Sequence, residues 1–173
     1  METTEKIVEA YCRYLKGWFT IPNIKCGGQH EIDLLAINPN SRPIKRYHIE
    51  SGVSISGSFS KLTSKDFSLE KLRQRNFTAQ QRRTVGYFHA QKFSSEHVIS
   101  KLSEYGFKEN NYCRIVVTWD YTPEAEAEAL RKSIIIWDFR EILKEITTTF
   151  KTERTYFTDD TLRTLQLLAR SQK

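Results

Sequence analysis

The chain has 173 residues, which is enough for one domain with a substantial core and leaves little room for a second. Hydrophobic residues make up 39% of it, which excludes a disordered chain, and 27 basic against 21 acidic residues give a net charge of +6. This charge is compatible with a nucleic-acid partner but does not establish one. No apolar run approaches the ~20 residues of a membrane-spanning helix, so we expect no membrane partner.

The three cysteines lie far apart, at Cys12, Cys26 and Cys113, and no C-x-x-C pair occurs. This spacing argues against a zinc cluster and against a disulfide framework. It fits a reducing cytoplasm, where we expect the protein to reside.

The N-terminal segment predicts a helix. Thr3 or Thr4 can cap it, and apolar residues then recur at helical spacing through Lys16. Gly17 is the predicted end of this helix.

Three strands follow the first helix. Pro22 is expected to close the first of them, and the other two are apolar on both faces, which is typical of a covered position in a sheet. The three predicted strands are Trp18–Ile21, Gln29–Ile37 and Ile44–Val53.

The middle of the chain is less regular. The Ser- and Gly-rich stretch Ser54–Ser60 predicts a loop, and part of the basic stretch Ser64–Arg83 predicts a helix anchored by apolar residues such as Leu69 and Leu72. Val85–Phe88 is expected to be a short extended piece.

The last part of the chain alternates helices with buried strands. The predicted strands are Tyr112–Trp119 and Ser133–Trp137, and the predicted helices are Glu96–Tyr105, Pro123–Lys132, one capped by Asp138 through Phe150, and one capped by Thr158 through Arg170. The order predicts an α/β fold with a mixed central sheet of about five strands flanked by helices. We expect a single domain over residues 1–173, with a core at about 5–137 and C-terminal helices over 138–171.

Two of the early strands each place a carboxylate inside an apolar run. A hairpin between them would bring Asp33 next to Glu50, and two desolvated carboxylates repel each other unless a cation lies between them. The pair therefore predicts a Mg²⁺ or Mn²⁺ site, with the backbone carbonyl of Ser51 as a third oxygen ligand. The alternative is that Asp33 pairs with an arginine and Glu50 faces solvent.

These residues resemble the PD-(D/E)xK restriction-endonuclease-like superfamily. Asp33 in H-E-I-D-L-L matches the first carboxylate of its motif, Glu50 in Y-H-I-E-S-G matches the Glu of E-x-K, and Glu9 matches a glutamate on the preceding helix. The resemblance covers roughly residues 5–137 and implies an αβββαβ core. It also implies a metal-dependent nuclease that hydrolyses phosphodiester bonds of nucleic acid with Mg²⁺ or Mn²⁺, and we favour DNA over RNA as its substrate.

The motif departs from the family at one position, because Gly52 stands where the lysine of E-x-K is expected. In the family that lysine orients the attacking water and stabilises charge on the phosphate. Lys61, Lys65 or His48 could supply the missing cation. Alternatively, the domain binds nucleic acid or a protein partner on the same fold without cutting.

Other members of the candidate site have plainer interpretations. Glu9 would be a solvated charge if it did not hold a metal-bound water, and His48 would be a buried, hydrogen-bonded histidine. Glu31 would pair with a Lys or Arg if it did not support a second metal.

A basic stretch follows the carboxylate strands and is a candidate track for a phosphate backbone. The alternative is a solvated helix face, which charge runs usually form. Its cations are Lys61, Lys65, Lys71, Arg73, Arg75, Arg82 and Arg83, against Asp66 and Glu70. Near the C-terminus, the apolar stripe of Thr164–Ala169 is expected to join the core first and to form a homodimer surface second.

Overall fold

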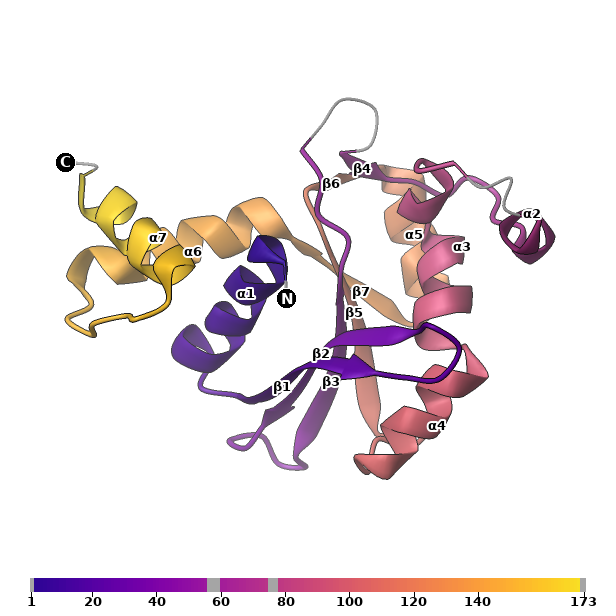
Figure 1. Ribbon diagram of the computed structural model, residues 1–173, viewed down its shortest axis with the longest axis horizontal. Helices are drawn as coiled ribbons and strands as arrows, with labels where there is room; N and C mark the ends of the chain where they lie inside the picture. The colour runs from indigo at the N-terminus through magenta and orange to yellow at the C-terminus, as the bar shows by residue number, and fades with distance from the viewer. Residues whose placement is uncertain (1, 56–59, 75–77, 172–173) are drawn as a thin grey trace.

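The computed structural model of the chain describes residues 2–55, 60–74 and 78–171. Its centre is a twisted sheet with helices on both faces. Figure 1 shows the sheet nearly edge-on, with α1, α6 and α7 on one side of it and α3, α4 and α5 on the other. The predicted α/β class, with a mixed five-stranded sheet flanked by helices, is confirmed.

The described elements follow the chain in this order. The strands are β1 (Phe19–Lys25), β2 (Glu31–Asn38), β3 (Lys45–Ser51), β4 (Lys61–Leu62), β5 (Tyr112–Thr118), β6 (Asp120–Tyr121) and β7 (Ile134–Asp138). The helical elements are α1 (Thr3–Ala10), η1 (Tyr11–Leu15), α2 (Leu69–Arg73), η3 (Gln81–Arg83), α3 (Val85–Tyr87), η4 (Phe88–Phe93), α4 (Glu96–Glu104), α5 (Pro123–Arg131), α6 (Phe139–Thr152) and α7 (Asp160–Ser171). Of these, η1 and η4 are π-helical and η3 is a 3₁₀ turn.

The central sheet has the strand order β1-β2-β3-β5-β7. Its first three strands pair antiparallel, and β3, β5 and β7 pair parallel. In the β2–β3 register Leu34 lies opposite Ile49, so the next position along brings Asp33 opposite Glu50. The same register puts Leu35 opposite His48. Because opposed residues share a face, both carboxylates and the His48 ring lie on one side of the sheet.

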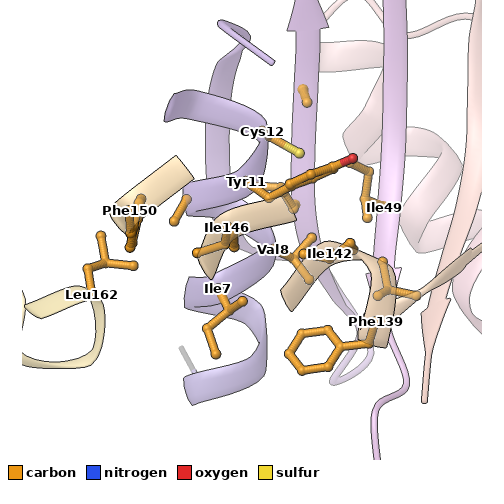
Figure 2. Packing of buried hydrophobic residues seen from close by; sticks show 14 of the residues in the cluster. Ile7, Val8, Tyr11, Cys12, Ile49, Phe139, Ile142, Ile146, Phe150 and Leu162 are labelled. Atoms are coloured by element: carbon orange, nitrogen blue, oxygen red, sulfur yellow. The ribbon is translucent and has the colours of Figure 1, made fainter. Parts of the chain in front are cut away.

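Alternate residues along the strands point to opposite faces of the sheet and pack into separate apolar cores. Leu34, Ile49 and Ile115 pack under α1, α6 and α7, where Figure 2 shows Val8, Ile142 and neighbouring side chains filling the interface. The opposite face is covered by η4, α4 and α5 through two further apolar clusters. The two carboxylates and the His48 ring lie on this second face, the face of Leu35. Burying both faces explains why these strands lack the simple polar alternation of a half-exposed sheet.

Some predicted helix boundaries are confirmed, whereas the predicted starts of two helices and the predicted end of one strand are wrong. Asp138 caps α6 as expected, its carboxylate accepting from the Arg140 N–H. The first helix is capped by Glu2 rather than by a threonine, because Glu2 and Glu5 form a reciprocal capping box. The last helix begins after Asp159 rather than Thr158, since the Asp159 carboxylate accepts from two backbone N–H groups.

The predicted end of the first strand at Pro22 is also wrong, because β1 continues through Pro22 to Lys25. β1 is an edge strand of the sheet, and an edge strand tolerates a residue that lacks a backbone N–H.

The extended piece predicted at Val85–Phe88 is instead helical. Thr84 caps this helix by accepting a hydrogen bond from the Tyr87 N–H, and the chain stays helical through Phe93. Phe88 and Phe93 are both buried against the sheet. Burial of these two rings selects a helix where local preference indicated extended backbone.

Part of the predicted loop after the third strand, residues 56–59, lies outside the described residues. Among the helices within the described ranges, none is long and apolar enough to cross a bilayer.

Candidate functional site

Asp33 and Glu50 lie side by side at the end of β3, and each carboxylate accepts a hydrogen bond from a backbone N–H group. The Asp33 Oδ2 atom accepts a hydrogen bond of 2.8 Å from the Ser51 N–H, and Glu50 Oε1 accepts one of 3.4 Å from the Asp33 N–H. The His48 Nε2 atom lies 2.7 Å from the same Glu50 oxygen. Glu50 and His48 are fully buried, whereas the Asp33 side chain retains some access to solvent. The predicted pairing of the two carboxylates is therefore present in the structure.

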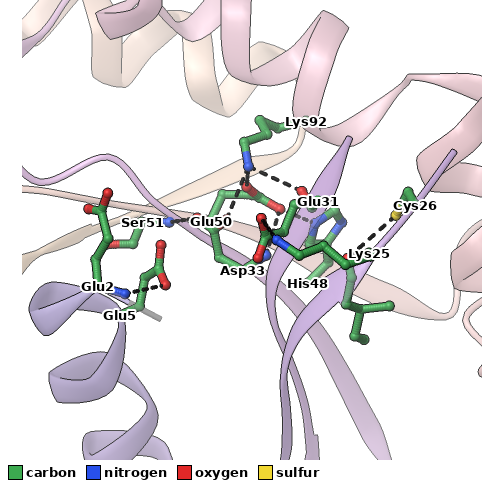
Figure 3. Close-up of polar contacts among 11 residues, drawn as sticks. Glu2, Glu5, Lys25, Cys26, Glu31, Asp33, His48, Glu50, Ser51 and Lys92 are labelled. Atoms are coloured by element: carbon green, nitrogen blue, oxygen red, sulfur yellow. Dashed lines mark hydrogen bonds and ion pairs between the residues drawn. The ribbon is translucent and has the colours of Figure 1, made fainter. Parts of the chain in front are cut away.

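A lysine that the sequence did not single out completes this cluster. Lys92, from η4, places its Nζ atom 3.1 Å from Asp33 Oδ1 and 2.5 Å from Glu50 Oε2. It also donates to the Glu31 carbonyl oxygen at 3.1 Å. Figure 3 shows Lys92 reaching down from the helix onto both carboxylates. The three oxygen contacts fix the ammonium between two strands that the lysine does not belong to.

The position of Gly52 explains why the lysine comes from a helix. A Cβ atom at residue 52 would lie 2.5 Å from Cζ of Phe88 and 3.2 Å from Nη1 of Arg83. The space that a strand lysine would need is thus filled by the Phe88 ring. Lys92 follows Phe88 within the same π-helix, so the helix that excludes a side chain at Gly52 also provides a cation. Short π-helical segments are frequent at functional sites.

The charges in this cluster are strongly coupled. Burial, reinforced by the charge of Glu50, raises the pKa of Asp33 to about 7, and burial raises the pKa of Glu50 to about 7 despite the opposing effect of Lys92. Burial and the nearby Lys92 charge lower the pKa of His48 to about 3, so this ring is neutral. Burial opposes the charge of Lys92, but Glu50 and Asp33 outweigh it and raise the pKa of Lys92. The cluster therefore contains one ammonium that stays protonated and two carboxyls whose raised pKa values oppose ionisation.

A pocket of about 450 Å³ opens over this cluster. Asp33, Lys92 and Gly52 form part of its wall, and Glu50 lies beneath Lys92 rather than on the pocket surface. Arg82 and Arg83 line the same pocket. The remaining lining residues are Glu2, Glu5, Ser51, Ser54, Ala79, Tyr87 and Phe88.

The helix glutamate at this pocket is Glu5, and the prediction of Glu9 is wrong. Glu9 faces a different pocket, where its carboxylate accepts from Thr20 Oγ1 at 3.0 Å and lies 3.5 Å from Arg13. Glu5 stands one turn earlier on α1. Burial raises the pKa of Glu5, and the charge of Asp33 adds to that rise. The error is one helical turn. It arises because the sequence does not determine the angle and position at which α1 packs on the sheet, and these decide which glutamate faces the pocket.

Neither lysine expected to replace the missing cation reaches the carboxylates. Lys61 lies on β4, where its Nζ atom is 3.3 Å from Asp120, and Lys65 is exposed on the following loop. His48 is present beside Glu50, but as a neutral ring and not as a cation. Glu31 pairs with Lys25, as in its plainer interpretation.

The predicted basic track is divided in the structure. Arg82 and Arg83 face the carboxylate pocket, whereas Arg73 lines a separate pocket that also contains His30 and His97. Lys71 is exposed on α2. Arg75 lies outside the described residues.

The donor set suits a hard divalent cation. Glu50 Oε2 is buried, and the Lys92 ammonium lies 2.5 Å from it. Asp33 presents a second carboxylate oxygen to that same ammonium. Within the described ranges no three His, Cys, Asp or Glu side chains converge as a metal-binding group, so a metal here would rely on the two carboxylates and backbone or water oxygens. The Lys92 ammonium lies between the two carboxylates, where the positive charge of a metal ion would otherwise be needed.

Comparison with models of protein families, with curated proteins and with solved structures found no match to this chain. The resemblance to the PD-(D/E)xK superfamily thus depends on the residues themselves.

Proposed function

We propose that the protein is a metal-dependent nuclease whose site consists of Asp33, Glu50 and Lys92. The observation that supports this most strongly is the ammonium of Lys92 in contact with both carboxylates, which supplies the cation that Gly52 lacks. Two carboxylates and a lysine are the chemical groups that the resemblance implies. DNA is the favoured substrate.

Each residue has a distinct role in this proposal. Asp33 and Glu50 would hold Mg²⁺ or Mn²⁺, with the Ser51 carbonyl as a further oxygen. The metal when bound would neutralise charge on the phosphate and lower the pKa of a bound water. Lys92, released from at least one carboxylate, would hold a non-bridging phosphate oxygen and stabilise its developing charge. Arg82 and Arg83 would bind neighbouring phosphates of the substrate at the pocket wall.

A second function, binding of nucleic acid without cleavage, is favoured by one specific observation. Glu50 is fully buried and already neutralised by Lys92, so the cluster can be stable with no metal at all. Such a module would keep Arg82 and Arg83 as phosphate contacts and would lose binding as salt rises.

The test is incubation of the purified protein with single-stranded, duplex and branched DNA, and with RNA, in Mg²⁺ or Mn²⁺. We expect cleavage by the wild type and its loss in Asp33→Asn, while Glu9→Gln, a carboxylate of the other pocket, still cuts. Equal cleavage by the wild type and Asp33→Asn would refute the site. Binding without cleavage, retained in Asp33→Asn and weakened in Arg82→Gln/Arg83→Gln, would favour the second function.

A further inference from the structure

Another pocket, of about 400 Å³, lies where the loops before β5 and β7 meet η4. Basic side chains reach it from three different elements: His89 from η4, Arg114 from β5, and Arg131 from α5. Lys132 follows α5 and lines the same pocket. The other lining residues are Glu109, Asn110, Tyr112 and Ser133.

The positive charge of this pocket is only partly neutralised by the protein. Within the described part of the chain, neither Arg114 nor Arg131 forms an ion pair with a carboxylate, and Lys132 reaches Glu128 only at 3.8 Å. The Arg114 guanidinium instead lies over the Tyr112 ring, 5.9 Å from its centroid. Glu109 is the one acidic residue among those that line the pocket. The cluster therefore has room for an anion that balances its charge.

The dipole of α5 explains the positions of only two of these four basic residues. Arg131 and Lys132 lie at the C-terminal end of α5, where cations are stabilised by the helix dipole. Arg114 is on a strand and His89 is on a different helix, so neither position has that explanation. Burial, with the charges of Lys132 and Arg114, lowers the pKa of His89, so the ring lies within the electrostatic field of both cations.

We propose that this pocket binds a phosphate monoester, at a site separate from Asp33 and independent of the proposed hydrolysis. Guanidinium groups recognise phosphate through paired donors, and a dianionic group balances two or more cations. The volume falls in the range of about 300–1,000 Å³ that small-molecule pockets span, so the phosphate can bear an attached group such as a nucleoside. The same chemistry occurs in a free mononucleotide and at the phosphorylated end of a nucleic acid.

Calorimetric titration tests this proposal with inorganic phosphate, AMP, and one oligonucleotide duplex with and without a 5′-phosphate, in EDTA to prevent cleavage. The wild type should bind at least one phosphate monoester, and Arg131→Gln/Lys132→Gln should weaken that binding at least about tenfold. The matched control is Arg154→Gln, an exposed arginine away from the pocket, which should bind as the wild type does. Arg114→Gln is a second variant, and a native circular dichroism spectrum confirms that each variant is folded.

The arms distinguish the two sources of phosphate. AMP binding as tightly as the 5′-phosphorylated duplex indicates a free nucleotide, whereas tighter binding of that duplex indicates a nucleic-acid end. NMR titration should also show that the pKa of His89 rises when the phosphate is bound, because an anion favours the protonated ring. Absence of binding by every phosphate monoester, equal binding of the two duplexes with no binding of AMP, or equal loss in the Arg131/Lys132 and Arg154 variants would each overturn the proposal.

Discussion

Lys92 is the residue that turns a pair of buried carboxylates into a candidate catalytic site. Its ammonium has three oxygen neighbours from β2 and β3, although it belongs to a helix. A side chain held by this many acceptors is positioned accurately, and accurate positioning of charge is what stabilises a transition state.

Removal of that ammonium should therefore slow cleavage strongly without removing the metal ligands. We expect Lys92→Ala to lower kcat by about 10²-fold or more, the usual effect of losing one stabilising group. The control is Lys65→Ala, which removes an exposed lysine and should leave kcat unchanged. Initial rates on a fluorescent DNA substrate measure both. A Lys65 variant as impaired as the Lys92 variant would contradict the assignment.

The raised carboxyl pKa values predict a specific dependence of stability on pH. Asp33 and Glu50 have pKa values of about 7 when folded, against ordinary values of 3.8 and 4.5, so the folded protein binds more protons between about pH 4 and 7. Their contribution to stability is present below pH 4 and is lost as the pH rises through 7. The lowered pKa of His48 acts in the opposite direction, with stability lost as the pH falls below 6.5.

Comparison with Asp33→Asn/Glu50→Gln separates these effects, because His48 is present in both proteins. Urea unfolding in EDTA should show the wild type losing stability relative to the variant between pH 4.5 and 7.5. The relative loss should exceed about 1.4 kcal/mol, the equivalent of one pKa unit. A difference that is constant, or that grows in favour of the wild type as the pH rises, would refute the raised carboxyl pKa values.

At the scale of elements, η4 determines the geometry of the site, because one of its side chains blocks the strand position at Gly52 and another provides the lysine. Phe88 occupies the space over Gly52, and Lys92 reaches the carboxylates from the same π-helix. A methyl group at residue 52 would overlap the Phe88 ring.

Gly52→Ala should therefore destabilise the protein by about 1–3 kcal/mol, the usual cost of overpacking a core. The penalty should shrink when Phe88 is already replaced by alanine, because the clash partner is then absent. Chemical denaturation of the two single variants and the double variant gives the coupling energy. Strictly additive effects would show that Phe88 is not what excludes a side chain at Gly52.

Elements that bury a regular apolar pattern were predictable from the sequence, and those defined by long-range packing were not. The strands around Asp33 and Glu50, and hence the pairing of these two residues, follow from local pattern and hairpin register. Lys92 could not be found this way, because its role depends on how η4 crosses the sheet, and no local pattern predicted that helix. One signal was available: the position of Gly52 requires a cation from elsewhere, and Lys92 lies near two aromatic residues that mark a buried helix.

At the scale of the whole molecule, one core joins the two ends of the chain. Cys12, Ile146 and Phe157 belong to the same buried cluster under α1, α6 and α7. Cys12 is fully buried, and burial raises the pKa of its thiol to about 12. Cys26 and Cys113 are half-buried.

Thiol modification should therefore report the opening of this core. At pH 8, iodoacetamide should modify Cys12 at least about 10³-fold more slowly in the folded protein than in urea, because modification requires an unfolding event. Cys113 serves as the internal control and should react in the folded state. Mass spectrometry of digested peptides measures both sites. Similar rates at Cys12 and Cys113 would show that the shared core does not exist.

The most direct test of the central claim is a crystal structure of the protein soaked in Mn²⁺, with the metal located by anomalous scattering. We predict a peak bound by oxygens of Asp33 and Glu50, with Lys92 Nζ displaced from at least one of the two carboxylates. No peak at this position at a saturating Mn²⁺ concentration, with Lys92 still in contact with both carboxylates, would contradict the assignment of a metal-dependent nuclease site.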